Sequence, residues 1–410
     1  MLYAGVVVVL MKTRAVRIGD FVFEKEEREA VNALMDRNSI SEGEECLRFE
    51  EGFAGHIGTD YCVTCNSGTS ALMLVLQAMK YHSGFNAREG QKILTTPLTY
   101  IATSNSIATT GFRPVYVDIN EHNFNLSEEQ VKEHFEGVDA EEYAGIMPVH
   151  LIGYPCNMKI INSIARKHNI PVIEDSAEAH GSIYDGKKTG SLGFAGCFSF
   201  YIAHNIQVGE FGAITTNDRE LADRCRRLKG NGRLCYCTVS QIHSGRCPHT
   251  NMEFNPRYMH DMIGYNFKPM EIQATIGNVQ LRKIGEINRR RRENVRHLND
   301  LLSVVQDLLK LPEYSDDVSY LGYPLVVKEK NLSRSAISSF LIKQGIENRP
   351  IFNCIPTQQP AYAHLKKEYA GKLPNAEHVG NNGFYVGCHQ FLKSDDIEYV
   401  AENIIKAVKK

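Results

Sequence analysis

The chain has 410 residues, of which 43% are hydrophobic and 23% are charged. This is the composition of an ordinary globular protein, and it excludes a disordered, collagen-like or disulfide-stapled miniature scaffold. The 46 Lys and Arg residues nearly balance the 48 Asp and Glu residues, for a formal net charge of −2. We therefore expect neither a nucleic acid nor a membrane as partner. At about 150 residues per domain, the length predicts two domains, or one large and one small domain.

The first residues predict no membrane anchor. The apolar stretch over residues 5–10 is too short to span a bilayer, and it lacks the basic leader and cleavage site of a signal peptide. Met11, which is followed by basic residues, offers an alternative start, so residues 1–10 are either a short strand or absent from the mature protein. The eleven cysteines then predict free thiols in a reducing compartment, and we expect a cytoplasmic protein.

Between about residues 60 and 220, short apolar runs alternate with helical segments. The apolar runs predict strands over residues 61–65, 92–96, 114–118, 145–149, 171–175, 198–200 and 212–215. A predicted helix over 70–81 follows the first of these strands. Apolar runs flanked by helices indicate an α/β fold with a large, mostly parallel sheet covered on both faces.

A long charged helix over 271–298 follows, and it includes the basic run 289–292. Because Glu286 and Glu293 flank this run, we interpret it as a solvated helix face rather than a nucleic-acid site. A strand over 321–327 and helices over 333–344 and 395–408 then indicate a smaller α/β unit. We predict a large domain with the N-terminal segment over residues 1–290 and a small C-terminal domain over residues 291–410.

Three features suggest a cofactor site, and each has a structural alternative. The small residues 67–71 join a strand to a helix, where backbone N–H groups bind anions, although such turns are common in α/β proteins. Asp175 ends an apolar strand, where it is either a ligand-binding carboxylate that keeps a pyridine nitrogen protonated or a helix N-cap. Tyr100 follows another strand end and either stacks on an aromatic ring or packs in the core.

In this order the features resemble the sugar aminotransferase family of fold type I pyridoxal-phosphate enzymes, which modifies nucleotide-linked keto sugars. The resemblance runs from about residue 21 to residue 408. It is carried by the segments 67–71, 174–181, 198–200 and 263–266. It implies that the chain is a fold type I PLP-dependent transferase with a large cofactor-binding domain and a small C-terminal domain.

The resemblance also implies roles for individual residues. Gly68, Thr69 and Ser199 would hold the cofactor phosphate, Asp175 would pair with the pyridine nitrogen, and Tyr100 would stack on the ring. Asn266 would reach the phosphate from the neighbouring subunit, which implies a homodimer with a shared active site. Glu178 stands where the family usually has the Gln that bonds the ring hydroxyl, and we assign it to the cofactor site.

Five residues after Ser199, the aminotransferases of this family carry the lysine that forms the Schiff base, and this chain has His204. An imidazole forms no imine, but with an unperturbed pKa near 6.5 it suits proton transfer at neutral pH. Lys187 and Lys188 follow an Asp-Gly turn, and we interpret them as solvated loop residues. A histidine here marks the nucleotide-diphospho-4-keto-6-deoxyhexose 3-dehydratase branch, which residues 209–210 and 382–387 also resemble.

This branch implies an enzyme that uses pyridoxamine 5'-phosphate to remove the 3-hydroxyl of a nucleotide-linked 4-keto-6-deoxyhexose in deoxysugar biosynthesis. An aminotransferase of the same fold, with another amine replacing the lysine, is the first alternative. A catalytically inactive relative that binds a nucleotide sugar is the second. The sequence identifies neither the nucleotide and sugar nor the amine donor or reductant.

Cys235, Cys237 and Cys247 form a C-x-C-x9-C pattern, and close cysteines in an intracellular chain are more often metal ligands than accidents. Some dehydratases of this branch carry a 2Fe-2S cluster in this region, which would imply a reductase partner. Their remaining cysteine falls where this chain has Ser176 and Ala177. The alternative fourth ligands are Cys197, Cys225, His243 and His249. The loop is either a cluster site or a relic or zinc-binding loop.

Cys62 and Cys65 have C-x-x-C spacing within a predicted strand. Because a strand alternates its side chains between two faces, the two thiols should point in opposite directions. We predict buried core residues there rather than a redox pair.

Overall fold

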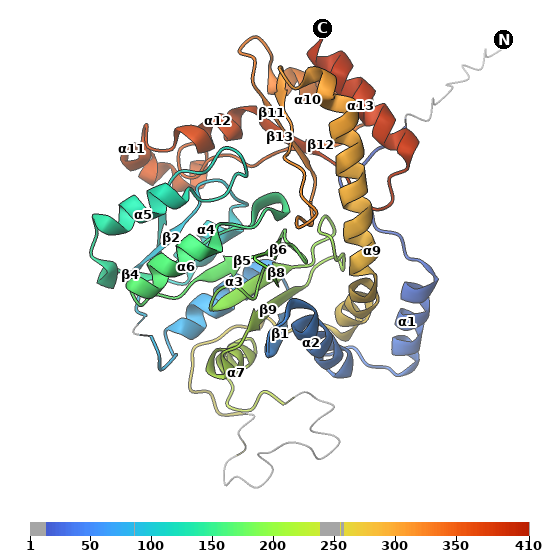
Figure 1. Ribbon diagram of the computed structural model, residues 1–410. Helices are drawn as coiled ribbons and strands as arrows, with labels where there is room; N and C mark the ends of the chain where they lie inside the picture. The colour runs from blue at the N-terminus through green and yellow to red at the C-terminus, as the bar shows by residue number, and fades with distance from the viewer. Residues whose placement is uncertain (1–13, 86, 238–254, 256–257, 410) are drawn as a thin grey trace, which may run out of the picture.

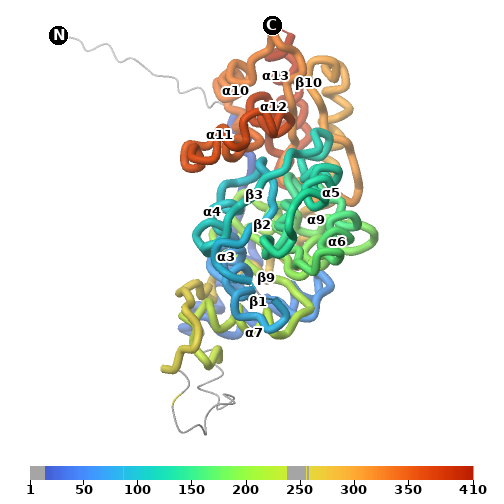
Figure 2. Tube along the Cα trace, turned by 90° about the vertical axis from the view of Figure 1, so that its left-hand side faces the viewer, coloured from blue at the N-terminus to red at the C-terminus, as the bar shows by residue number. Residues whose placement is uncertain are grey.

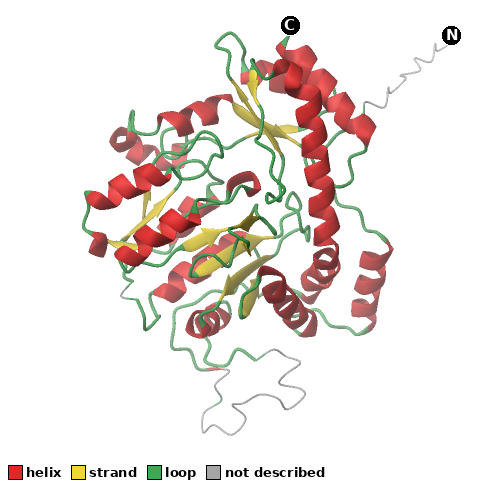
Figure 3. Cartoon of the chain, viewed as in Figure 1, coloured by secondary structure: helices red, strands yellow, loops and turns green. Residues whose placement is uncertain are grey.

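The structure is a computed structural model that describes residues 14–85, 87–237, 255 and 258–409. A central sheet lies in the lower part of the molecule in Figure 1, and a smaller sheet lies above it beside the C-terminal helices. Helices surround both sheets (Figure 3). Among the described residues, no helix combines the length and the apolar character needed to cross a lipid bilayer.

The central sheet consists of a three-stranded and a four-stranded group. The first group has the order β3 (Arg113–Tyr116), β2 (Lys92–Thr95) and β4 (Tyr143–Met147), and the second has the order β1 (Tyr61–Cys65), β9 (Gly212–Thr216), β8 (Ala195–Ser199) and β5 (Ile173–Asp175). Parallel bridges join β4 to β5. All pairings are parallel except those of β9, which runs antiparallel to β8 and β1. The predicted mostly parallel sheet is confirmed.

Neighbouring strand residues are buried on opposite faces of this sheet. In β1, Cys62 belongs to a cluster with Phe49 and Phe198, whereas Cys65 belongs to a cluster with Leu74. Both thiols are buried, so the predicted core role of the C-x-x-C pair is confirmed. The helices of this part are α1 (Lys25–Asp36), α2 (Glu44–Ile57), α3 (Gly68–Met79), α4 (Ala102–Thr109), α5 (Glu128–Glu136), α6 (Met158–Lys167) and α7 (Arg219–Leu228). A two-stranded ribbon is formed by β6 (Ile183–Tyr184) and β7 (Lys187–Lys188).

The second sheet is antiparallel throughout. Its order is β10 (Leu309–Lys310), β11 (Tyr323–Val327), β13 (Gly383–Val386) and β12 (Asn348–Pro350). Its helices are α10 (Arg334–Lys343), α11 (Lys366–Tyr369), α12 (Pro374–Asn382) and α13 (Ser394–Val408). In Figure 2 this part lies directly above the part that holds the central sheet.

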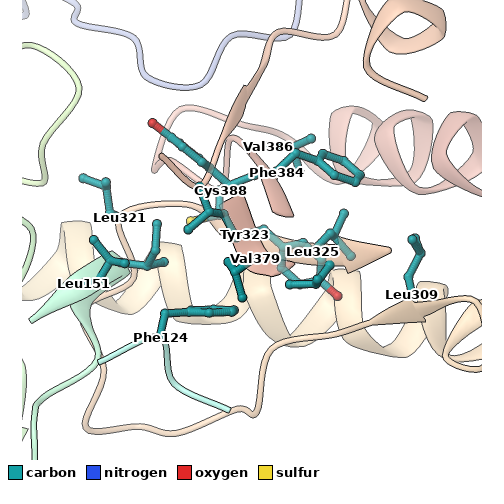
Figure 4. Packing of buried hydrophobic residues seen from close by; sticks show 14 of the residues in the cluster. Phe124, Leu151, Leu309, Leu321, Tyr323, Leu325, Val379, Phe384, Val386 and Cys388 are labelled. Atoms are coloured by element: carbon teal, nitrogen blue, oxygen red, sulfur yellow. The ribbon is translucent and has the colours of Figure 1, made fainter. Parts of the chain in front are cut away.

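The helix α9 (Glu271–Leu302) spans 32 residues and connects the two parts. It contacts α1 and α2 at one end and α13 at the other (Figure 1). One hydrophobic cluster combines Phe124 and Leu151 with Tyr323, Leu325 and other residues of the second sheet (Figure 4). The predicted boundary between residues 290 and 291 falls within α9 and stays a prediction.

The basic run on α9 is only partly solvated, so that interpretation is wrong at one position. Arg289 and Arg290 pair with Glu293, and Arg289 also pairs with Glu286, as the flanking acids led us to expect. Arg291 instead has no exposed surface and is among the largest fully buried side chains. The reason is helical geometry, since Arg291 lies on the face of α9 that packs against the rest of the chain.

Candidate active site

The turn before α3 is shaped to receive an anion. The Ser67 hydroxyl accepts a hydrogen bond from the Ser70 N–H at 3.1 Å, which makes Ser67 the N-cap of the helix. The Ser70 hydroxyl donates to Asn66 Oδ1 at 2.6 Å. The N–H groups of Gly68 and Thr69, in the first turn, have no intrahelical acceptor, and the helix dipole favours negative charge there.

Gly68 lies directly against Ser199, at the end of β8. A Cβ atom on Gly68 would collide with the Ser199 side chain, so no larger residue fits without a shift. Gly212 is similarly required, because its Cβ atom would collide with the Ser67 carbonyl. The structure therefore brings Gly68, Thr69 and Ser199 together at one edge of the sheet, as the resemblance implied.

Asp175 ends β5, the strand next to β8, and its side chain is buried. Its Oδ2 atom accepts a hydrogen bond from the Thr103 hydroxyl at 2.8 Å, and Oδ1 accepts from the Ala177 N–H at 3.3 Å. Burial raises the pKa of Asp175, against the lowering effect of these two hydrogen bonds. No helix begins directly after Asp175 in the described chain, so the N-cap alternative is wrong.

Glu178 is buried close to Asp175. Its Oε2 atom accepts a hydrogen bond from the Ile152 N–H at 2.7 Å. Ile152 has φ of 56°, which is unfavourable for a β-branched residue, so this segment is held in place by its contacts. Burial and the Asp175 charge raise the pKa of Glu178 to about 8, although the Ile152 hydrogen bond opposes them. The side chain is therefore largely protonated at neutral pH.

Tyr100 is 62% exposed, so the core-packing alternative is wrong. Its ring centroid lies 6.0 Å from that of Phe352, in the second half of the chain. The preceding residue, Thr99, lies 3.0 Å from the Thr103 hydroxyl, and Thr103 in turn bonds Asp175. The loop that carries Tyr100 is thus tied to the Asp175 carboxylate.

Asn266 is exposed and lies beside the α3 turn through its neighbour in the chain. The Phe267 carbonyl accepts a hydrogen bond from the Asn66 N–H at 2.9 Å. The Phe267 N–H donates to the Lys229 carbonyl at 3.0 Å, which fixes this segment against the end of α7. No contact of the Asn266 side chain with Gly68 or Ser199 is recorded within the described chain.

His204 is half-buried, and its orientation is fixed by Ser199. The Nδ1 atom lies 2.6 Å from the Ser199 carbonyl oxygen and must donate to it, so Nε2 carries the free lone pair of the neutral ring. Burial, and to a smaller extent the Arg291 charge, lower the pKa of His204 to about 4, against the raising effect of the Ser199 hydrogen bond. The imidazole is therefore a neutral base at pH 7.

A second histidine, which we assigned no role from the sequence, lies next to the first. His180 is buried, and its ring centroid is 5.8 Å from that of His204. Its Nδ1 atom accepts a hydrogen bond from the Ile206 N–H at 3.1 Å. Burial lowers the pKa of His180 well below its usual value, with a further contribution from His204. The one sequence signal for a role of His180 was its position in the segment 174–181, which carries the family resemblance.

Two of the lysines that could replace the missing amine, Lys188 and Lys229, are engaged in other contacts. Lys188 is half-buried and donates to the His56 carbonyl, so our interpretation of it as a solvated loop residue is wrong. Lys187 is exposed, as expected. Lys229 is buried, where it pairs with Glu42 at 2.5 Å and donates to the Thr64 carbonyl at 2.7 Å. Its acidic neighbours raise the pKa of Lys229 despite its burial.

The cysteine pattern is only partly described. Cys235 and Cys237 are buried and form a small cluster of their own. Cys247, His243 and His249 lie outside the described residues. Cys197 and Cys225 belong to a different cluster, the apolar core under α3, where burial raises the pKa of both thiols. Within the described chain, no group of three His, Cys, Asp or Glu side chains is arranged to hold a metal ion.

A mostly parallel sheet that brings an anion-binding helix turn, a strand-end serine and a buried aspartate to one edge defines a fold type I pyridoxal-phosphate-dependent enzyme. The chain belongs to the DegT/DnrJ/EryC1/StrS aminotransferase family, whose sequence model matches residues 22–405. The predicted fold class and family are confirmed.

The relatives include both kinds of enzyme that we considered. The chain is 34% identical over 378 residues to the GDP-perosamine synthase of Caulobacter vibrioides, covering 91% of this chain and 93% of that protein. It is 30% identical over 409 residues to the dTDP-4-dehydro-2,6-dideoxy-D-glucose 3-dehydratase of Saccharopolyspora spinosa, covering 96% and 87%. The solved structure of an E. coli GDP-4-keto-6-deoxy-D-mannose-3-dehydratase with bound hydrated PLP has a TM-score of 0.83 and 25% identity, covering 95% of this chain and 99% of that one.

Proposed function

We propose that this protein is a pyridoxamine-phosphate-dependent 3-dehydratase that deoxygenates a nucleotide-linked 4-keto-6-deoxyhexose in deoxysugar biosynthesis. The observation that carries the proposal is His204, a neutral imidazole at the position where the aminotransferases of this family are expected to have their lysine. The engagement of Lys188 and Lys229 in other contacts supports the same assignment, since neither amine is free to replace that lysine.

The residues at the sheet edge fit the cofactor. The N–H groups of the α3 turn and the Ser199 hydroxyl would hold its phosphate, and the missing Cβ atom of Gly68 allows this approach. Asp175 would pair with the pyridine nitrogen, while Tyr100 and Glu178 would contact the ring. When bound, pyridoxamine phosphate supplies a primary amine that condenses with the sugar ketone and a ring that takes up negative charge.

His204 would act as the base and then as the acid. The Ser199 carbonyl holds the Nδ1 proton, so Nε2 is the atom that accepts a proton. The resulting imidazolium can release that proton to the departing 3-hydroxyl, which leaves as water. The exposed Tyr100 ring, if it stacks on the cofactor, would help to exclude bulk water from this proton transfer.

An aminotransferase is the second candidate, and one observation favours it. The identity to a GDP-perosamine synthase is 34%, whereas that to a 3-dehydratase is 30%. This candidate requires an amine that forms a covalent link with the cofactor. A catalytically inactive, nucleotide-sugar-binding relative is a further alternative, and retention of the cofactor during purification would count against it.

We propose a homodimer in which Asn266 reaches the cofactor phosphate of the partner subunit. We also propose that Cys235, Cys237 and Cys247 contribute to a 2Fe-2S cluster, which would require a reductase as partner. Anaerobic purification with iron and sulfide analysis tests the cluster: Cys235→Ser should lower the iron content, and zinc in place of iron would contradict it.

Product analysis tests the main proposal. The purified protein with pyridoxamine phosphate should convert a 4-keto-6-deoxyhexose linked to GDP, dTDP or CDP into a product that is lighter by one oxygen atom, as measured by mass spectrometry. The pyridoxamine phosphate supplies the reducing equivalents, so PLP and ammonia should appear in equal amounts. The His204→Asn variant should lose this activity and retain cofactor binding. Exchange of the keto oxygen for an amine by the wild-type protein, with no loss of water, would favour the aminotransferase instead.

A further inference from the structure

Arg291 is a buried cation without an acidic partner. Its side chain has no exposed surface, and no carboxylate of the described residues lies within ion-pair distance of its guanidinium group. Its Nε atom has no hydrogen-bond partner among the residues that the structure describes. Burying an unpaired guanidinium group costs free energy of folding. We therefore expect Arg291 to make hydrogen bonds that another side chain could not make.

The guanidinium group instead binds main-chain carbonyl groups of two distant segments. Nη1 donates to the Leu321 carbonyl at 2.8 Å and to the Tyr320 carbonyl at 3.2 Å. Nη2 donates to the His204 carbonyl at 3.4 Å. One side chain of α9 thus links the loop that carries His204 to the segment that leads into β11.

One turn earlier on α9, Asn288 holds the adjacent residues. Its Oδ1 atom accepts a hydrogen bond from the Asn205 side chain at 2.8 Å, and its Nδ2 atom donates to the His180 carbonyl at 2.8 Å. His204 is therefore fixed at its ring by Ser199, at its carbonyl by Arg291, and through the next residue by Asn288.

We propose that Arg291 is a positioning residue for His204, holding the loop of the base against the segment that enters the second sheet. This inference rests on the proposed function only in taking His204 as the base. Within the described chain, the His204 ring contacts the rings of Tyr201, from the same loop, and His180, from the segment after β5, and the His204 carbonyl accepts a hydrogen bond from Arg291 of α9. Of these, only Arg291 is charged at neutral pH. The same guanidinium group lowers the pKa of His204 and of His180, and thereby helps to keep both rings neutral.

The test compares variants of the full-length, cofactor-loaded protein labelled at histidine Cε1. Titration by NMR, with His204→Asn to assign the signal, reports the pKa of His204 directly. Arg291→Gln should raise this pKa by a small, measurable amount, because the charge is gone while burial, the main cause of the low value, remains. Arg291→Lys keeps the charge but cannot span two segments, so it should leave the pKa low and reduce kcat about 10- to 100-fold with little change in KM.

Asn294→Ala is the matched control. Asn294 is also a buried side chain of α9 that donates to main-chain carbonyls, those of Cys388 and His389, but it has no recorded contact with His204. This variant should lower the melting temperature while leaving both the His204 titration and kcat unchanged. The proposal is overturned if Arg291→Gln leaves the titration of His204 as in the wild type, if Arg291→Lys retains full kcat, or if Asn294→Ala shifts them equally. If the wild-type protein performs no dehydration, the proposed function fails, and the titrations still decide the role of Arg291.

Discussion

The Nδ1 atom of His204 lies 2.6 Å from the carbonyl oxygen of Ser199. The same Ser199 residue packs against Gly68 with its side chain, at the turn where an anion can bind. Ser199, at the end of β8, therefore sets the tautomer of His204, the proposed base, and also contacts the turn that we propose as the phosphate site. The proposed base and the proposed cofactor site are thus linked through one residue.

Replacing Gly68 with alanine should weaken cofactor binding. The added Cβ atom collides with the Ser199 side chain, so we expect a loss of about 1–3 kcal/mol in stability and a decrease of roughly 10-fold or more in PLP affinity. Absorbance titration with PLP measures the affinity. Gly55→Ala is the control, because nothing lies within 4 Å of a Cβ atom there, and it should leave PLP binding unchanged. Equal affinities for wild type and Gly68→Ala would refute the proposed phosphate site.

Asp175→Asn should abolish most of the activity. An amide cannot stabilise a protonated pyridine nitrogen, so we expect the rate to fall about 100-fold or more while the fold is retained. The matched control is Asp118→Asn. Asp118 is also buried, and it accepts hydrogen bonds from the N–H groups of Asn375 and Ala376 at 2.8 and 2.9 Å. That variant should lose stability but keep its turnover. A fully active Asp175→Asn variant would remove this residue from the cofactor site.

Stability should fall in mild acid because buried histidines are held neutral. Burial, with help from the Arg291 charge, lowers the pKa of His389 to about 4, whereas the unfolded value is about 6.5. Between these values the unfolded chain binds more protons, so the free energy of unfolding decreases as the pH falls from about 6.5 to about 4. His389 alone should contribute about 2 kcal/mol between pH 7.5 and pH 5.

Urea unfolding at the two pH values measures this contribution. His389→Gln should show a smaller loss of stability in acid than the wild type, since a glutamine amide can still donate to the Arg17 carbonyl that His389 Nε2 faces at 3.2 Å. His364→Gln, at an exposed position, should behave as the wild type. An unchanged pH dependence in His389→Gln would show that this ring is not held neutral by folding.

His204→Lys should restore the chemistry of the aminotransferases. With a primary amine at this position, we expect PLP to become covalently attached, the cofactor absorbance spectrum to change, and transamination from L-glutamate to replace dehydration. His180→Lys is not equivalent, because the His180 side chain is fully buried and its Nδ1 atom is occupied by the Ile206 N–H. A His204→Lys variant with the same cofactor spectrum as the wild type would contradict the assignment of His204 to the reacting centre.

The sequence predicted those parts of the fold that depend on short stretches of neighbouring residues. The strands of the central sheet were predictable from apolar runs, and the turn at Gly68 from its small residues next to a strand. The helices α1 and α2 were not predicted, and neither starts with a side-chain cap, since Glu24 and Gly43 accept no capping hydrogen bond from their helices. The sequence offered only the acidic residues in the first turn of each helix. The start of α2 is instead capped by a distant residue, because the N–H groups of Gly43, Glu45 and Cys46 donate to the Glu271 carboxylate.

Long-range contacts account for the predictions that were wrong. Arg291 resembled its neighbours Arg289 and Arg290, but it lies on the packed face of α9, where it donates to the distant carbonyls of His204 and Leu321. Lys188 was likewise predicted to be solvated, but in the fold it donates a hydrogen bond to the His56 carbonyl. The candidate site residues were assigned from a family resemblance and stay predictions, whereas their protonation could not be predicted from the sequence. The pKa of His204 or Glu178 depends on burial, which follows from the whole fold.

Borohydride treatment of the wild-type protein with PLP tests the central claim most directly, because it fixes any imine between the cofactor and a lysine. Intact-mass and peptide analysis should find no pyridoxyl adduct on the wild-type chain, whereas His204→Lys treated in parallel should gain one at residue 204. A pyridoxyl-lysine peptide from the wild-type protein would mean that the cofactor is anchored after all, and the account of an untethered, histidine-assisted dehydratase would be wrong.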